Sequence, residues 1–301
     1  MDGLRQTTIA REGALEGVAL HTGAPVRMFL RPAPAGAGIV FRRADLVAEG
    51  EIPESAARVP ARADLVADAR LGVTLRNAAG VSARTVEHLM AALALCEVDN
   101  VLADLEGPEL PILDGSAAPF IDLIGRCGLT TLPAPRRFIE ATRTLRETDA
   151  ERFVEISPAR GRRIEVSIDF ADPAIGRQSA SLSLDDAETA RRRLGPARTF
   201  CALREVDVMR AAGLARGGSL DNAVVVDGAR VLNAEGLRDP AEFVLHKALD
   251  LVGDLALAGA PVRGRIVAHK PGHDLNTRLA RRILEQFAPD RPSAAPARLT
   301  A

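Results

Sequence analysis

The segment from Phe243 to Leu257, FVLHKALDLVGDLAL, carries charged groups within an apolar stretch. On a helix, His246, Asp250 and Asp254 are spaced four residues apart and therefore lie on one face. Each of these groups is costly to desolvate without a partner, so the three side chains must share one small place. Two interpretations follow. Either Asp250 only orients His246 in a satisfied buried pair, or both residues bind one metal ion.

A catalytic zinc ion takes three protein ligands and keeps a fourth position open, so His246 and Asp250 would need one further ligand. The segment VEHL offers His88, with Glu87 beside it. A glutamate next to a metal-binding histidine can reach the attacking water without occupying the metal, which suits a general base. In HKPGHDLN, His273 follows Pro-Gly and precedes a helical pattern, so we expect it at a helix entrance. A simple capping role would explain His273 equally well.

Composition narrows the class of protein. The 301 residues suggest two domains, and a net charge of −1 with a pI near 6.6 gives no basic field for nucleic acid. The N-terminal segment lacks the apolar run of a signal peptide, and no run of about 18 apolar residues is present, so we expect a cytoplasmic protein without a transmembrane segment. Cys96, Cys127 and Cys201 are isolated, which argues against disulfides and thiolate zinc; Cys96 and Cys127 are expected to pack in the core.

Lysine is rare in this arginine-rich chain. Lys247 and Lys270 are its two lysines, and each lies within three residues of a histidine. Chance survival in a biased composition is one explanation. The other is chemical, because lysine and arginine differ enough in shape and hydration for a site to demand one of them.

The order of elements is similar in the two halves. Strand-like segments VRMFLRP and GIVFRR precede ARTVEHLMAALALC, where a stripe formed by Val86, Leu89, Met90 and Leu93 predicts an amphipathic helix with His88 on the opposite side. The segment LTTLPAPRRF reads as a linker. The second half again begins with strands, RFVEISP and RIEVSIDF, and later carries the helix with His246.

Several long motifs, in order, give the chain a family resemblance. They are GVALHTG, RPAPAGAGIVFRRADL, TVEHLMAAL, PILDGSAAPF, ARTF, GGSLDNAVVVD, VLNAEGLRDPAEFVLHKALDLVGDL and GHDLN. Over nearly its whole length the chain resembles the zinc-dependent UDP-3-O-acyl-N-acetylglucosamine deacetylases of lipid A synthesis. The resemblance implies an α+β fold of two similar domains, each a β-sheet with a helical layer, packed helix to helix around the site. We expect the domains at 1–130 and 136–288, with a flexible tail at 289–301.

The resemblance also implies the metal site and the proton-transfer groups. Its metal is one Zn²⁺, with Fe²⁺ an open possibility in the cell. The ligands would be His88, His246 and Asp250, and Glu87 would be the general base.

Further catalytic roles follow from the same resemblance. His273, in its protonated form, would stabilise the oxyanion or donate to the leaving amine, and Asp254 would orient it. Thr199 of ARTF would hydrogen-bond the developing oxyanion. Each role agrees with what the side chain can do chemically.

Substrate-binding residues carry over in the same way. Asp169 and Phe170 of SIDF resemble the uracil-binding pair, and Phe200 would pack against the sugar. Lys247 and Lys270 resemble the family's diphosphate and sugar contacts. The plain alternative for the two phenylalanines is a core position.

The insert of the second domain, around CALREVDVMRAAGLARGG, would form an apolar passage for the acyl chain. We expect four residues to line it: Cys201, Val206, Met209 and Leu214. The chain departs from many family members at Ala69, Val73 and Leu245, none of which we expect to touch the metal or acid–base residues. His21 receives no chemical role, and His269 is expected at the surface.

The implied reaction is hydrolysis of the N-acetyl group of UDP-3-O-[(3R)-3-hydroxyacyl]-N-acetylglucosamine, which gives acetate and UDP-3-O-acyl-glucosamine, the committed step of lipid A biosynthesis. A monomer is expected. Two alternatives are a zinc amidohydrolase acting on another acylated amine and a non-catalytic nucleotide-sugar-binding paralogue. A nucleic-acid-binding module is disfavoured by the near-neutral charge and the lack of interleaved basic and aromatic residues.

Overall fold

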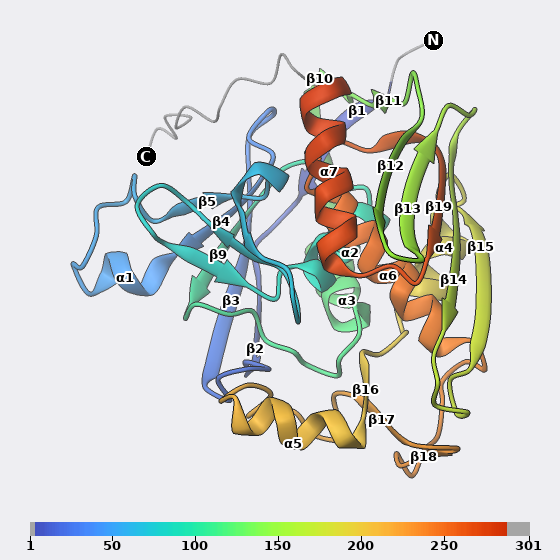
Figure 1. Cartoon of the computed structure of the whole chain (residues 1–301). Helices are drawn as coiled ribbons and strands as arrows, with labels where there is room; N and C mark the ends of the chain where they lie inside the picture. Colours follow the sequence, from blue (N-terminus) through green and yellow to red (C-terminus); the bar gives the residue numbers. More distant parts are fainter. Residues whose placement is uncertain (1–3, 288–301) are drawn as a thin grey trace.

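The computed structural model describes residues 4–287, so the predicted tail lies outside the described residues. Figure 1 shows two β-sheets on either side of a central pair of helices, α2 and α6. This arrangement is the α+β fold expected from the sequence. The domain boundaries at 1–130 and 136–288 stay a prediction.

The N-terminal sheet has the strand order β2-β3-β9-β4-β5. Its strands and accompanying helices are β2 (Gly13–Val18), β3 (Pro25–Pro32), β4 (Ile39–Arg43), α1 (Ala44–Ala48), β5 (Arg58–Pro60), α2 (Glu87–Leu95), β9 (Val101–Glu106) and α3 (Ala118–Cys127). The central strand β9 runs antiparallel to β3 and parallel to β4. Alternating burial along β3 turns Met28 and Leu30 into the core, as its period-two pattern predicts.

The C-terminal sheet repeats this layout with the order β12-β13-β19-β14-β15, and the short β11 also pairs with β19. Its elements are β11 (Ile139–Glu140), β12 (Leu145–Asp149), β13 (Arg152–Ser157), β14 (Arg162–Asp169), β15 (Arg177–Ser183), α4 (Ala187–Leu194), α6 (Glu242–Ala256), β19 (Val262–His269) and α7 (His273–Phe287). Here β19 is antiparallel to β13 and parallel to β14. Thus α2 and α6 precede equivalent central strands, and α3 and α7 follow them.

Helices α2 and α6 pack directly against each other. Gly253 makes their close approach possible, because a Cβ at this position would lie 2.2 Å from the backbone oxygen of Glu87. The contact brings the start of α2 to the middle of α6. It therefore joins the two sequence segments that carry the candidate metal ligands.

The prediction that α2 is amphipathic, with one exposed side, was wrong. The helix begins at Glu87, with Val86 as its N-cap, and its side chains from Glu87 through Leu93 are all buried. Since α6 covers the side opposite the predicted stripe, His88 is as inaccessible as the apolar residues around it. A helix that is apolar nearly all round is one packed on several sides.

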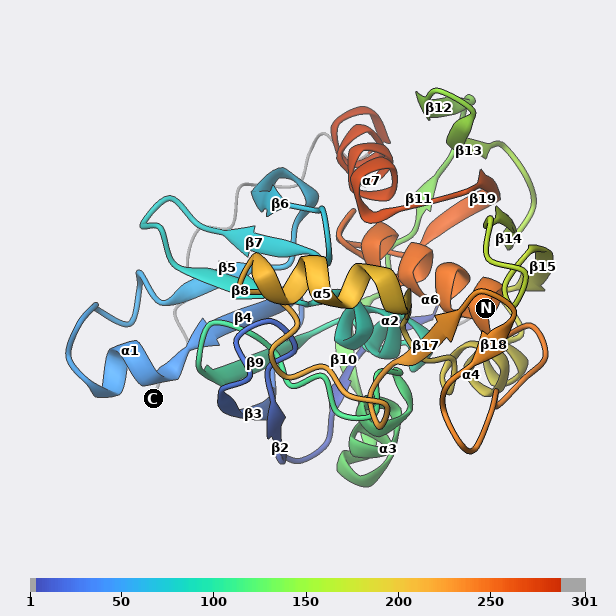
Figure 2. The ribbon, with the colours of Figure 1, turned by 60° about the horizontal axis from the view of Figure 1, so that its bottom comes forward.

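Two inserts carry small sheets of their own. The first holds η1 (Ala63–Leu65), β6 (Val66–Asp68), β7 (Thr74–Arg76) and β8 (Ser82–Arg84). The second holds β16 (Phe200–Ala202), α5 (Leu203–Ala211), β17 (Val224–Asp227) and β18 (Arg230–Val231). Figure 2 shows α5 lying across the ends of both halves.

The segment predicted as a linker forms a strand instead. β10 (Leu129–Pro135) pairs antiparallel with β1 (Arg5–Ile9), so the beginning of the chain is tied to the connection between the halves. Its residues are mostly exposed, and the proline-containing pattern concealed the edge pairing. Within residues 4–287, the helices are all too short or too polar to cross a bilayer.

Candidate active site

Three buried side chains form a cluster with the geometry of a metal site. The ligand atoms of His88, His246 and Asp250 all lie within 4.8 Å of one another. The Oδ1 atom of Asp250 is 3.3 Å from Nε2 of His246 and 3.8 Å from Nε2 of His88. Among the described residues this Oδ1 is buried without a hydrogen-bond partner. A buried, unpartnered carboxylate oxygen facing two imidazole nitrogens suits a divalent cation.

The protonation states of the cluster agree with metal binding. Burial, followed by the proximity of His246, lowers the pKa of His88 to about 3, and burial likewise lowers the pKa of His246. Burial alone would raise the pKa of Asp250, but its neighbours His246 and Lys247 outweigh burial and hold it below the usual range. Neutral imidazoles and an ionised carboxylate are the forms that bind a metal.

Glu87, the first residue of α2, stands beside the cluster without joining it. Its Oε2 accepts a hydrogen bond of 2.9 Å from the backbone N–H of Val73. Gly72 passes over the other oxygen so closely that a Cβ there would lie 2.8 Å from Oε1. Burial raises the pKa of Glu87 to about 7, which is the range of a base that works near neutral pH.

His273 lies opposite Glu87 at the start of α7, the helix entrance that the sequence predicted. Its Nδ1 donates to Oδ2 of Asp254 at 2.9 Å, and its Nε2 lies 3.8 Å from Oε1 of Glu87. Burial alone would lower the pKa of His273, but Asp254 and Asp250 outweigh it and raise the pKa to about 10. Asp254 is itself fixed by a 2.9 Å hydrogen bond from Asn276. His273 is therefore held as a cation with one N–H directed toward the site.

Aromatic rings connect this cluster to the surface. The ring of Phe200 lies 6.1 Å from that of His246 and 5.4 Å from that of Phe170, which is 38% exposed. The Nζ of Lys247 is 5.4 Å from the centre of the Phe200 ring and 2.8 Å from Oδ2 of Asp250. Lys247 thus pairs with the carboxylate of the candidate metal cluster and faces the Phe200 ring.

Lys270 and Asp169 lie farther out. The Nζ of Lys270 donates to Glu151 at 2.7 Å and lies 3.8 Å from Oδ2 of Asp169. Asp169 also accepts from Arg177 at 3.1 Å. The two predicted substrate residues are neighbours, and each has a partner that a ligand would have to compete with.

Thr199 is placed by its main chain. Its N–H donates to the carbonyl of Gly115 at 2.8 Å, and its own carbonyl accepts from Val224 at 2.8 Å. Through these bonds the ARTF segment lies between a turn of the N-terminal half and the second insert. Two residues earlier, the carbonyl of Ala197 accepts from Nδ1 of His246 at 3.0 Å, so the ARTF segment contacts the candidate metal cluster through Ala197.

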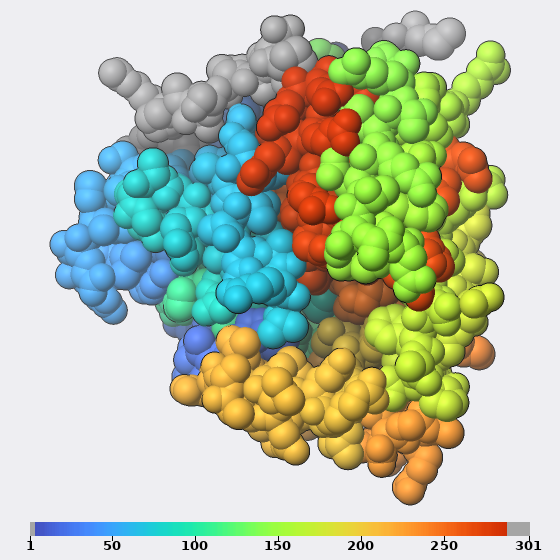
Figure 3. Space-filling model, in the orientation of Figure 1, coloured from blue at the N-terminus to red at the C-terminus, as the bar shows by residue number. Residues whose placement is uncertain are grey.

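Figure 3 shows a hollow above α5, with atoms of α2 and α6 visible at its floor. The predicted lining residues of the acyl passage, Val206, Met209 and Leu214, are half-buried on or next to α5. The large cavity within residues 4–287, of about 1170 Å³, lies elsewhere, beside the C-terminal ends of α2 and α6, and no predicted site residue lines it. The acyl passage stays a prediction.

Comparison with known proteins decides the family. The sequence pattern described as UDP-3-O-acyl N-acetylglycosamine deacetylase matches residues 6–285. The chain belongs to this family. Proteins named UDP-3-O-acyl-N-acetylglucosamine deacetylase include one from Myxococcus xanthus (strain DK1622), 47% identical over 93% of this chain and 86% of its own length. Another, from Phenylobacterium zucineum (strain HLK1), is 45% identical over 92% of each chain.

One expectation about departures from this deacetylase family was wrong. Val73 is wholly buried, and its N–H is a direct hydrogen-bond donor to Glu87. This contact uses the backbone, which is why the side-chain change gave no hint of it. Ala69 is half-buried and borders a small pocket with Asp274, while Leu245 is wholly buried in α6.

Two histidines, His269 and His21, were given no catalytic or metal-binding role. His269, which we expected at the surface, is half-buried at the end of β19, where its Nδ1 pairs with the Ser167 hydroxyl at 2.9 Å. His21 is buried, with Nε2 3.2 Å from the carbonyl of Leu71.

Two residues next to the site were missed in the sequence. Arg198, within ARTF, and Glu242 form a buried ion pair with Nε and Oε1 2.8 Å apart. Glu242 lies four residues before His246 and extends its polar stripe by one turn. That spacing was the available signal, since a carboxylate in such an apolar helix needs a partner. Cys96 and Cys127 are buried, as predicted.

Proposed function

We propose that the chain is a zinc-dependent deacetylase that hydrolyses the N-acetyl group of UDP-3-O-acyl-N-acetylglucosamine, releasing acetate and UDP-3-O-acyl-glucosamine as the committed step of lipid A biosynthesis. The observation that carries the proposal is the convergence of His88, His246 and Asp250, with Glu87 and His273 facing each other beside them. Family membership supports the same reaction. The expected cytoplasmic location and monomeric state stay predictions.

The donor set fits a zinc ion. His88, His246 and Asp250 would hold it, leaving one position for water or the substrate. When bound, the ion would supply Lewis acidity toward the acetyl carbonyl and the attacking water. Two imidazoles and one carboxylate also fit Fe²⁺.

The two proton-transfer groups divide the reaction between them. Glu87, ionised and held by Val73, takes a proton from the attacking water. His273 enters as a cation, since Asp254 raises its pKa, and gives its Nε2 proton to the leaving amine. Its charge also stabilises negative charge on the acetyl oxygen, together with the hydroxyl of Thr199.

Residues outside the cluster orient the substrate. Phe170, exposed and in edge contact with Phe200, would stack on uracil, and Asp169 would hydrogen-bond the base. Lys247 and Lys270 would contact the sugar and diphosphate. The half-buried apolar face of α5 would receive the acyl chain, because apolar contact removes that chain from water.

Incubation of the purified protein with UDP-3-O-acyl-N-acetylglucosamine tests the proposal. We expect equimolar acetate and free-amine product, loss of activity after chelation, and recovery on adding Zn²⁺. Glu87→Gln is the matched control, because it keeps the shape of the side chain but cannot accept the proton. Absence of acetate from zinc-loaded wild-type protein would refute the proposal.

The same assay separates the alternatives. A zinc amidohydrolase of other acylated amines would release acetate equally well from N-acetylglucosamine lacking the uridine and acyl groups. A non-catalytic nucleotide-sugar-binding paralogue would bind the substrate without releasing acetate. The intact Glu87–His88 pair and the charged His273–Asp254 pair support the catalytic alternative.

A further inference from the structure

The short segment Ala197–Phe200 borders the candidate metal cluster at His246. Its first carbonyl, of Ala197, accepts from Nδ1 of His246 at 3.0 Å, and its last ring, of Phe200, lies 6.1 Å from the imidazole. A hydrogen bond to the nitrogen that does not face the metal fixes both the tautomer and the ring orientation of a ligating histidine. The position of this segment therefore decides where Nε2 of His246 points.

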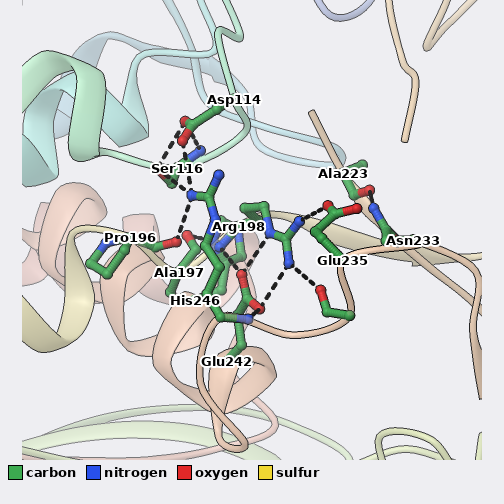
Figure 4. Close-up of polar contacts among 12 residues, drawn as sticks. Asp114, Ser116, Pro196, Ala197, Arg198, Ala223, Asn233, Glu235, Glu242 and His246 are labelled. Carbon is green, nitrogen blue, oxygen red and sulfur yellow. Dashed lines mark hydrogen bonds and ion pairs between the residues drawn. The ribbon is translucent and has the colours of Figure 1, made fainter. Parts of the chain in front are cut away.

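Arg198 occupies the middle of the segment and is only 1% exposed. Its Nε donates to Oε1 of Glu242 at 2.8 Å, and its Nη2 donates to Oε2 at 3.2 Å and to the carbonyl of Gly236 at 2.7 Å. Figure 4 shows the guanidinium between Glu242 and Glu235, with Ala197 and His246 beside it. The planar fork of arginine is satisfied on both edges, which restricts it to one orientation.

Glu242 also holds the main chain of the segment. Its Oε1 accepts from the backbone N–H of Arg198 at 3.1 Å, and its Oε2 accepts from that of Arg238 at 2.7 Å. As the first residue of α6, Glu242 lies one turn before His246 on the same face. Helix α6 thus binds both polar groups of the single peptide unit between Ala197 and Arg198: Glu242 accepts from its N–H, and His246 donates to its carbonyl.

The same segment is tied to the N-terminal half. Arg238 donates from Nη1 to Asp114 at 2.8 Å and to the carbonyl of Pro196 at 3.0 Å, the residue just before the segment. The N–H of Thr199 reaches the carbonyl of Gly115. These contacts leave the segment little freedom to move independently of either half (Figure 4).

A fully buried ion pair is weak evidence for a stabilising role, because the desolvation of both charges offsets much of their attraction. A pair of apolar residues could fill the same volume. An apolar pair could not accept a hydrogen bond from the backbone N–H of Arg198, and so could not fix the orientation of the Ala197 carbonyl. The geometry of this pair is thus better explained by orientation than by stability.

We propose that Arg198 and Glu242 are positioning residues that set the orientation of His246, and with it the metal affinity, through the Ala197 carbonyl. The inference rests on the proposed metal site. It also assigns the pair a role in placing Thr199, which follows Arg198 directly. The hydrogen bonds of the two side chains go to each other, to Glu235 and to main-chain groups, and not to the candidate metal ligands.

The test compares Zn²⁺ affinity and the visible absorption of the Co²⁺-substituted protein in two charge-preserving variants. Arg198→Lys keeps the charge but cannot reach Glu242 and Gly236 together, and we expect Zn²⁺ binding to weaken roughly 10–100-fold, with a shifted Co²⁺ spectrum. Arg42→Lys is the matched control. Arg42 makes a two-point pair with buried Asp104, at 2.6 and 2.5 Å, in the N-terminal sheet. We expect its metal affinity to stay within about twofold of wild type, since the site is remote.

A second variant covers the case in which Arg198→Lys does not fold. Glu242→Gln keeps the shape but turns an N–H group toward Arg198 or Arg238, so the same weakening and spectral shift are expected. Wild-type affinity and spectrum in a folded Arg198→Lys or Glu242→Gln protein would overturn the inference. The variant His246→Ala distinguishes an error in the positioning role of Arg198 and Glu242 from an error in the proposed metal site. If His246→Ala also binds zinc normally, the metal site itself is wrong.

Discussion

Helices α2 and α6 occupy equivalent places in two sheets of the same topology, yet they contribute differently to the site. Helix α2 offers Glu87 and His88 at its first turn only. Helix α6 is longer and carries a polar stripe at four-residue spacing, with Glu242 and His246 at one end and Asp254 at the other. Both helices are buried on nearly all sides.

The difference shows how a repeated scaffold can hold an asymmetric site. One end of a helix can place two adjacent side chains in different directions, which separates the proposed base Glu87 from the proposed ligand His88. Two ligands for one ion require a shared face, which α6 supplies at i and i+4. The same contrast holds for the following helices, since α7 begins with His273 whereas α3 begins with Ala118 and Pro119.

Removal of a proposed metal ligand should have the largest effect on zinc content and activity. The effect should be equal for ligands from α2 and from α6. We expect His88→Ala, from α2, and His246→Ala or Asp250→Ala, from α6, each to lose near-stoichiometric zinc and nearly all activity, because three ligands are the minimum of a catalytic site. Elemental analysis of the purified variants measures this. Full zinc occupancy in all three would exclude the proposed site.

The proton-transfer residues should separate chemistry from metal binding. Glu87→Gln and His273→Ala should each keep zinc and lose roughly 10²–10⁴-fold in turnover. In the proposed reaction Glu87 acts when deprotonated, so activity should rise as pH passes its pKa, about 7. His273 acts there when protonated, so activity should fall as pH passes its pKa, about 10. A metal cation bound nearby would lower the pKa of both Glu87 and His273, so both limbs of the pH profile would move to lower pH in the same order. Each variant should abolish one limb of kcat/KM against pH, and near wild-type turnover of Glu87→Gln would rule out its role as base.

The contact between α2 and α6 should be sensitive to one methyl group. Gly253→Ala puts a Cβ 2.2 Å from the backbone oxygen of Glu87, and we expect a loss of about 1–3 kcal/mol in the free energy of unfolding. Gly125→Ala, at an exposed position of α3 with open space around it, should instead gain about 0.5–1 kcal/mol. Urea denaturation of both variants makes the comparison. Equal stability of the two would mean that the helices do not approach as closely as described.

The two lysines should differ in effect, because Lys247 contacts the proposed metal ligand Asp250 whereas Lys270 pairs with Glu151. Lys247→Arg preserves charge but exchanges a compact ammonium for a larger fork beside Asp250, and we expect turnover to fall roughly 10-fold. Lys270, paired with Glu151 farther out, should mainly support binding, so Lys270→Ala should raise KM more than it lowers kcat. Steady-state kinetics with zinc content checked decides this. Wild-type parameters for both would indicate lysines retained by chance.

The sequence indicated local patterns well where they depended on spacing. The four-residue interval placed His246 and Asp250 on one face, and Pro-Gly placed His273 at a helix start, because helix geometry alone decides both. Alternating residues predicted β3, β13 and β14 for the same reason. The strand β10 was missed because its partner, β1, lies more than one hundred residues away in the chain.

The sequence by itself determined which chemical groups the protein has and which of them share a helix face or a helix entrance, since these depend on neighbours within a few residues. Only the tertiary structure decided that His88 meets Asp250 across the α2–α6 contact and that Val73 donates to Glu87 through its backbone. It alone placed Arg198 on Glu242. Burial and long-range contact set the desolvation and the partners of each charge, so the raised pKa of Glu87 and the cationic state of His273 belong to the fold rather than to any segment.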